Sequence, residues 1–237
     1  SFSAKTYGLR LGGPIIKDKL FFFVNGEIQK SQTPMPFNYG TYNGSVSQTQ
    51  VNSLVSYLQN TYNYDPGSYE DVASELKAQK FLIKLDYNIS NNHKLSFRHS
   101  YNNGENYSPS SSSTSRIRFA NGGVFFPSKT NSTTLELNSN FGNKSNKLVL
   151  ARTSVNDDRD PMGNDFPYVA IVDGDIEFGS EQFSTANLLT QEVITLTDNF
   201  NLYKGKHTLT FGTHNEFYNM NNVFVRQNFG WYEFDDI

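Results

Sequence analysis

Hydrophobic residues recur at every second position in several stretches of the chain. In one of them, Phe81, Ile83, Leu85, Tyr87 and Ile89 alternate with mainly polar residues. A period of two places the apolar side chains on one face of a β-strand and the polar side chains on the other. The pattern predicts eight strands, near residues 5–12, 20–30, 79–90, 94–102, 130–141, 147–157, 190–203 and 207–219.

The segments between these strands alternate strictly between short and long. The short ones are rich in Gly, Asn and Pro, which favour tight turns. They lie at residues 13–19, 90–93, 142–146 and 204–206, and the long ones lie at about 31–78, 102–129 and 158–189. A soluble β-sandwich mixes its loop lengths, whereas an outer-membrane barrel has short turns at one end and long loops at the other. We therefore expect an all-β fold, an antiparallel transmembrane β-barrel with short periplasmic turns and long extracellular loops.

In a barrel of this kind the apolar face of each strand meets lipid and the polar face lines the lumen. Three apolar residues near the short turns, Phe21, Phe23 and Leu148, are nevertheless predicted to face the lumen. Asp198 is the opposite exception, a charged residue that the alternation places on the lipid-facing side. A β-bulge nearby would move its side chain to the other face. The charged residues expected to face the lumen are Arg10, Glu27, Lys84, Asp86, Arg98, Glu136, Arg152 and Glu216.

The first long loop contains a pattern of a different period. Val51, Leu54, Val55 and Leu58 have helical spacing, which predicts a short amphipathic helix. Tyrosines surround it in the sequence, and their rings and hydroxyls suit the capture of a peptide or a glycan at an outer surface. Packing of the loop against its neighbours would explain them equally well. The candidate ligand-binding residues are Tyr39, Tyr42, Tyr57, Tyr62, Tyr64 and Tyr69.

The composition of the 237 residues excludes several classes of protein. A net charge of −3 argues against nucleic-acid binding, and the absence of Cys excludes disulfides and thiol chemistry. Apolar residues make up only 36% of the chain while aromatic residues reach 15%, as expected where one face of each strand is wet and aromatic girdles mark the membrane boundaries. No nucleophile elbow or phosphate-binding loop is present. We expect neither an enzyme nor a cofactor.

The sequence gives only weak indications of a metal site. The histidines, at positions 93, 99, 207 and 214, are scattered over different hairpins. Acidic residues gather at the start of the third long loop, and carboxylate oxygens are the ligands that Ca²⁺ prefers. Their spacing is not that of an EF-hand, so a solvated loop is the simpler interpretation. The weak calcium candidates are Asp157, Asp158, Asp160 and Asp165.

Two segments resemble a known family. Residues 4–27 contain a strand ending in Gly-Gly-Pro-Ile, a Lys-Asp-Lys turn and then Leu-Phe-Phe-Phe before an acidic residue. This is similar to an early barrel hairpin of TonB-dependent outer-membrane receptors, especially their Oar-like branch. Residues 197–212, with a Gly-Lys-His turn, resemble a later hairpin of the same family.

The resemblance implies part of a barrel of about 22 strands in the outer membrane of a Gram-negative bacterium. It further implies a plug, a segment that contacts the TonB complex, and import of an extracellular nutrient, with a surface lipoprotein as a possible partner. The plug and TonB segments are not among these residues, and we expect residues 1–237 to be a single partial barrel domain of a longer protein. Two alternatives remain: a structural or adhesive barrel whose loops bind a partner, and a soluble β-sandwich that binds carbohydrate.

Overall fold

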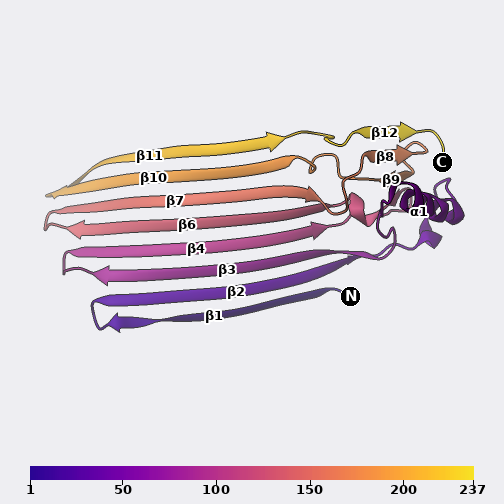
Figure 1. Ribbon diagram of the computed structural model, residues 1–237. Coiled ribbons are helices and arrows are strands. Elements are labelled where there is room, and N and C mark those ends of the chain that lie inside the picture. Colours follow the sequence, from indigo (N-terminus) through magenta and orange to yellow (C-terminus); the bar gives the residue numbers. More distant parts are fainter.

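The computed structural model describes residues 1–237, most of which form one antiparallel sheet of eight long strands (Figure 1). The strands contain 14 to 18 residues each, and they follow the chain order with hairpin neighbours side by side. They are β1 (Ser3–Ile16), β2 (Leu20–Met35), β3 (Val72–Asn88), β4 (His93–Ser108), β6 (Val124–Asn140), β7 (Lys144–Pro161), β10 (Asn187–Lys204) and β11 (His207–Phe224).

All eight predicted strands are present, and most extend several residues further toward the long loops than the alternation indicated. The short connections lie together at one end of the sheet (Figure 1). Three of them contain a residue with positive φ, namely Asp18, Gly142 and Gly205, as tight turns require. The sheet is open, because β1 and β11 form its two edges and do not pair with each other.

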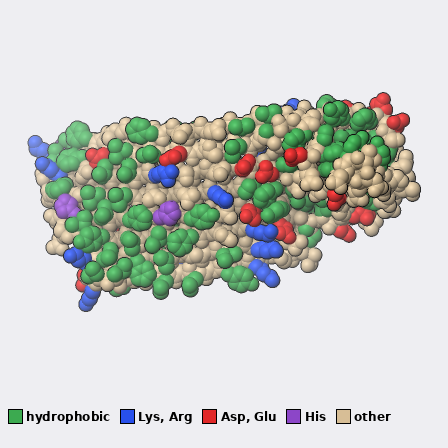
Figure 2. Space-filling view, viewed as in Figure 1, with side chains coloured by type: hydrophobic (Ala, Val, Ile, Leu, Met, Phe, Trp, Pro, Cys, Tyr) green, Lys and Arg blue, Asp and Glu red, His purple; other side chains and the backbone are tan.

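The register places the apolar side chains of all eight strands on one face. Leu85, for example, lies opposite Phe22 on β2 and Phe97 on β4, and Phe97 lies opposite Leu135 on β6. Figure 2 shows hydrophobic side chains gathered over the half of this face nearest the short turns. An apolar band that stops part-way along the strands is typical of a barrel wall, since about 9–11 residues of a tilted strand suffice to cross the hydrocarbon core. This face is the lipid-facing one.

The opposite face carries most of the charges that the sequence placed in the lumen. Lys84 Nζ lies 2.7 Å from Asp86 Oδ2, and Lys80 Nζ lies 2.8 Å from Glu27 Oε1. Phe21 and Phe23 lie on this face too, opposite Asp86 and Lys84, as the alternation predicted. The residues confirmed on the lumen face are Arg10, Glu27, Lys84, Asp86, Arg98, Glu136 and Glu216.

The predicted orientation of β7 was wrong. Leu148 lies opposite Leu137, and Arg152 lies opposite Thr133, so both side chains are on the lipid-facing side. Arg152 Nε pairs there with Glu192 Oε1 at 2.7 Å. The error arose because β7 has apolar residues on both faces and its alternation is lost. Asp198 is on the lipid-facing side as predicted, but no bulge accompanies it, since the register of β10 is continuous.

The long loops fold together into a second, smaller structure at the other end of the strands, which we call the loop cap (Figure 1). Its elements include a four-stranded sheet in the order β12-β8-β9-β5, in which β12 pairs parallel with β8. No helix of the structure is long and apolar enough to cross a membrane. The elements are η1 (Tyr39–Thr41), α1 (Gln48–Tyr62), β5 (Ile117–Arg118), η2 (Ala120–Gly122), β8 (Tyr168–Ile171), β9 (Ile176–Phe178) and β12 (Trp231–Phe234).

The buried hydrophobic cluster of the structure lies entirely in the loop cap. The eight-stranded sheet has no partner layer, so its apolar side chains face outward. In the cap, by contrast, apolar residues from all three long loops meet and exclude water, which is the main source of folding free energy for such a unit. The cluster consists of Phe37, Val46, Val51, Leu54, Leu58, Tyr64, Ile117, Phe119, Val169, Ile171, Ile176 and Phe178.

Candidate ligand-binding groove

Helix α1 forms one wall of a groove in the loop cap. Ser47 caps its N-terminus in a capping box with Gln50, and Asn63 ends it in the left-handed conformation, so both ends are satisfied locally. The buried face of the helix carries the apolar residues whose spacing predicted it. Tyr57 and Tyr62, which lie off that face, remain about half exposed.

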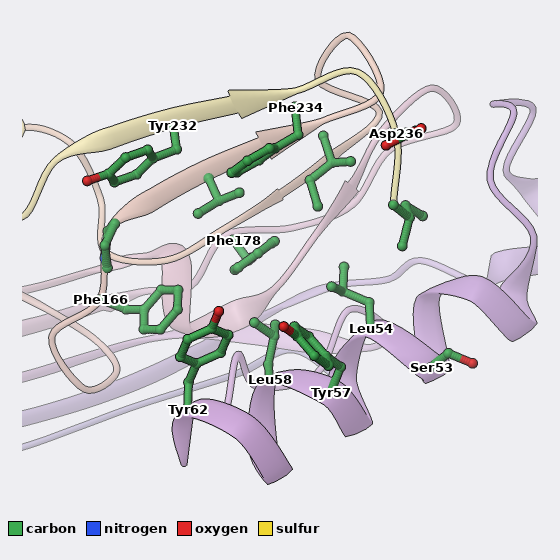
Figure 3. A pocket seen from close by; sticks show the side chains of 14 residues that line it. Ser53, Leu54, Tyr57, Leu58, Tyr62, Phe166, Phe178, Tyr232, Phe234 and Asp236 are labelled. Atoms are coloured by element: carbon green, nitrogen blue, oxygen red, sulfur yellow. The ribbon is translucent and has the colours of Figure 1, made fainter.

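The groove lies between α1 and the small sheet, and its volume is about 800 Å³. Figure 3 shows Tyr57, Leu58 and Tyr62 on the helix side, with Tyr232 and Phe234 of β12 on the opposite side. Eleven of the fourteen residues that line it are hydrophobic. A concave, mostly apolar site with a few polar groups is the usual form of a small-molecule or peptide site.

The aromatic rings along the groove contact one another in a continuous series. The rings of Tyr57 and Tyr62 are 5.8 Å apart, and Tyr62 is 5.9 Å from Phe166. Phe166 stacks on the buried Tyr64 at 4.1 Å and is 6.1 Å from Phe178. Because each ring is held by its neighbours, the groove presents largely fixed aromatic faces, which reduces the entropy lost when a ligand binds.

The six candidate tyrosines are divided by the fold into three positions. Tyr57 and Tyr62 line the groove. Tyr64 is buried beneath it, with 2% of its surface exposed, and burial raises the pKa of its hydroxyl to about 12. The remaining three pack against the core away from the groove and make hydrogen bonds within the cap. These are Tyr39, which donates to Val46 O, Tyr42, which donates to Asp175 Oδ2, and Tyr69, which donates to Asn52 Oδ1.

The charges around the groove are few. Asp236 is the one acidic side chain of the Asp or Glu type among the lining residues, Ser53 and the tyrosine hydroxyls add polar groups, and no Lys or Arg is present. The sequence interpretation missed the walls formed by Phe166, Phe178 and β12. The aromatic run of Trp231, Tyr232 and Phe234 was the available signal for β12, although nothing local indicated that it pairs with β8.

Two carboxylates join the three loops at the side of the cap. Asp175 Oδ2 accepts hydrogen bonds from Ser45 N at 3.1 Å and Ser45 Oγ at 2.9 Å. Glu177 accepts from Arg118 Nε at 2.6 Å and from Arg116 Nη1 at 2.9 Å. The first carboxylate therefore holds the first loop to the third, and the second holds the second loop to the third.

Asp175→Asn is expected to lower the free energy that holds the first loop in place by about 1 kcal/mol, since hydrogen bonds to a charged acceptor are stronger than those to an amide. The backbone amide of Ser45, chiefly, holds the pKa of Asp175 below its usual value of 3.8. The stabilisation is therefore present above that value and is lost as the pH falls through the lowered pKa. Pepsin cleavage within residues 38–47 should rise steeply in acid for the native chain and less steeply for the variant. Equal pH profiles would contradict this role.

The four calcium candidates are divided between the two faces of β7 and the loop that follows it. Asp157, Asp158 and Asp160 lie on β7, where successive side chains point to opposite faces, and Asp165 lies in the loop that follows. No group of three or more His, Asp or Glu side chains in the structure is arranged to hold a metal ion. Asp158, Asp160 and Asp165 are exposed to water, whereas Asp157 Oδ1 is buried without a hydrogen-bond partner.

Comparisons with known proteins agree with the architecture of the long strands. The transporter YddB from Escherichia coli matches with a TM-score of 0.60 at 8% identity over 92% of this chain and 26% of that one. The siderophore receptor PirA from Acinetobacter baumannii matches with a TM-score of 0.55 at 14% identity over 90% of this chain and 27% of that one. The chain thus spans about a quarter of each. At such identities the likeness shows the fold.

A search of curated proteins finds no match. The family described as "Outer membrane beta barrel domain" matches residues 29–237. This match covers most of the chain, and it agrees with the lipid-facing band and with the open sheet of long antiparallel strands. The protein is located in the outer membrane of a Gram-negative bacterium, and the chain belongs to the outer membrane β-barrel domain family.

Proposed function

We propose that this chain is part of a TonB-dependent receptor of the Oar-like branch, which captures a nutrient outside the cell and imports it. The hairpin of residues 4–27 supports the branch. The unpaired outer edges of β1 and β11 support a larger barrel, of about 22 strands, because open sheet edges are not tolerated in lipid. The plug and the segment that contacts the TonB complex lie outside these residues.

The observation that carries the proposal is the aromatic groove in the loop cap, above a barrel wall of transporter type. A ligand that approaches from outside meets this groove before the lumen. Its lining is apolar and carries a carboxylate without any basic residue, so it suits a neutral or cationic ligand with apolar side chains. A peptide fits this chemistry better than a glycan, whose many hydroxyls would find few partners.

Replacing both Tyr62 and Tyr232 by Ala is expected to weaken peptide binding by at least about 10-fold, because burial of an aromatic side chain contributes roughly 1.5–3 kcal/mol. The measurement uses the full-length receptor in detergent, with a panel of short peptides rich in Leu and Phe and a matched panel of neutral oligosaccharides. Tyr203→Ala, at the short-turn end of β10, is the control. Unchanged affinity in the double variant, or preferential binding of oligosaccharides, would overturn the peptide assignment.

Import is tested separately from capture. Cells that express the receptor should accumulate labelled peptide, and dissipation of the proton gradient should stop accumulation while surface binding persists. A purely adhesive barrel would bind the peptide but would not accumulate it under either condition.

A further inference from the structure

Three lysines face the lipid side of the sheet in one row across three strands. Lys5 on β1 lies directly opposite Lys30 on β2, and Lys30 lies directly opposite Lys77 on β3. The next lipid-facing positions toward the short turns are Tyr7, Ile28 and Gln79. Figure 2 shows basic side chains one above another where the hydrophobic half of this face ends. We call these residues the lysine row, and it lies at the outer boundary of the apolar band.

Like charges directly opposite one another on a sheet are destabilising, so the row needs compensation. Lys77 Nζ is 3.6 Å from Glu75 Oε2 and 4.5 Å from the centre of the Tyr107 ring. Neither Lys5 nor Lys30 has an acidic side chain within ion-pair distance, and both are exposed. Glu105 on β4 lies directly opposite Lys77. The three lysines and the carboxylates of Glu75 and Glu105 therefore leave an excess of one positive charge at a height where the polar parts of lipids lie.

A small hollow adjoins the row. It has a volume of about 210 Å³, and its lining includes Lys30, Lys77, Gln79, Asn103 and Glu105. Asn103 Oδ1 is buried and has no hydrogen-bond partner. An unpaired acceptor beside two ammonium groups suits a ligand that presents an anionic oxygen to the lysines and a hydroxyl donor to the amide.

A second hollow adjoins the first on the side of the short turns, within the apolar band. Its volume is about 540 Å³, and it lies over Gly26, where the lipid-facing side of β2 carries no side chain. Tyr7, Leu9, Ile28, Phe81 and Tyr101 line it. A Cβ added at Gly26 would contact nothing within 4 Å, so the space is free for a hydrocarbon chain.

We propose that this part of the barrel wall binds a phosphorylated glycolipid of the outer leaflet. The lysine row binds its phosphate, Asn103 accepts a hydrogen bond from a sugar hydroxyl, and an acyl chain fills the hollow over Gly26. The two hollows are contiguous, since Ile28 and Gln79 line both. A free phosphate would use only the first hollow, whereas a lipid uses both.

The test measures binding of diphosphorylated lipid A to the full-length receptor in nanodiscs. Lys30→Gln combined with Lys77→Gln should weaken binding about 10- to 30-fold, because each lysine near a charged membrane surface contributes about a factor of five. Gly26→Val, which fills the second hollow, should also weaken it. Lys17→Gln combined with Lys19→Gln, at the opposite end of the strands, should leave it unchanged.

The ligand series identifies the source of the phosphate. Dephosphorylated lipid A should bind as weakly to the native receptor as lipid A does to the Lys30/Lys77 variant, and inorganic phosphate should not compete at equal concentration. Equal binding of the dephosphorylated lipid, effective competition by inorganic phosphate, or an equal loss in the Lys17/Lys19 variant would each overturn the proposal. If Gly26→Val left binding unaffected, the proposed contact of the acyl chain with the second hollow would be wrong.

Discussion

Leu85→Arg is expected to destabilise the barrel in a membrane by roughly 2–4 kcal/mol, the cost of a charged side chain on the lipid face near the bilayer midplane. Leu85 lies in the apolar band, opposite Phe22 and Phe97. An arginine there has no charged partner on the neighbouring strands and must expose its guanidinium to hydrocarbon. The free energy of unfolding is measured by denaturant titration of the full-length receptor refolded into lipid vesicles.

The same strand provides a matched control. Leu82 lies on the lumen face, opposite Asn25 and Ser100, so Leu82→Arg introduces the same charge into a polar lumen and should cost less than about 1 kcal/mol. Lys84→Ala, also on the lumen face, should be similarly mild, although it removes the ion pair with Asp86. If both arginine variants lost the same stability, the assignment of faces would be wrong.

The sequence predicted the long strands because their pattern is local and repeated. A period of two over ten residues can be recognised without knowing which strands lie beside it. The short turns were recognisable from residues such as Gly142 and Gly205. The face assignment failed only on β7, where Leu148, Val149, Leu150 and Ala151 leave no alternation to read. There the face is decided by the register with β6, which no local pattern encodes.

The loop cap was beyond reach of the sequence pattern for a related reason. Helix α1 was found because the helical spacing of its apolar residues is contained within residues 51–58. The small sheet joins β12 to β8 and β9 to β5, pairings between short strands from separate loops. Strands of two to four residues carry too few positions to show a period.

The candidate site was accordingly half predicted. Tyr57 and Tyr62 were identified because they accompany the helix, whereas Phe166, Phe178 and Tyr232 reach the groove through tertiary pairing. Tyr64 shows why composition alone cannot identify binding residues, since a tyrosine-rich loop contributes tyrosines both to the buried core and to the surface. Only the packing of the cap distinguishes the two.

Phe119→Ala is expected to cost the loop cap about 3–5 kcal/mol, the usual effect of removing a buried Phe side chain. Phe119 is fully buried, and its ring lies 5.7 Å from Tyr69 and 6.4 Å from Phe178, so it joins all three long loops. Hydrogen exchange should accelerate in α1 and β9 while the eight long strands keep their protection, because their hydrogen bonds do not depend on the cap. Phe183→Ala, at a ring that is 41% exposed, should leave exchange unchanged. Peptide binding at the groove should weaken in the Phe119 variant and stay unchanged in the Phe183 variant. A cap that kept its protection from exchange without Phe119 would show that its loops fold independently of one another.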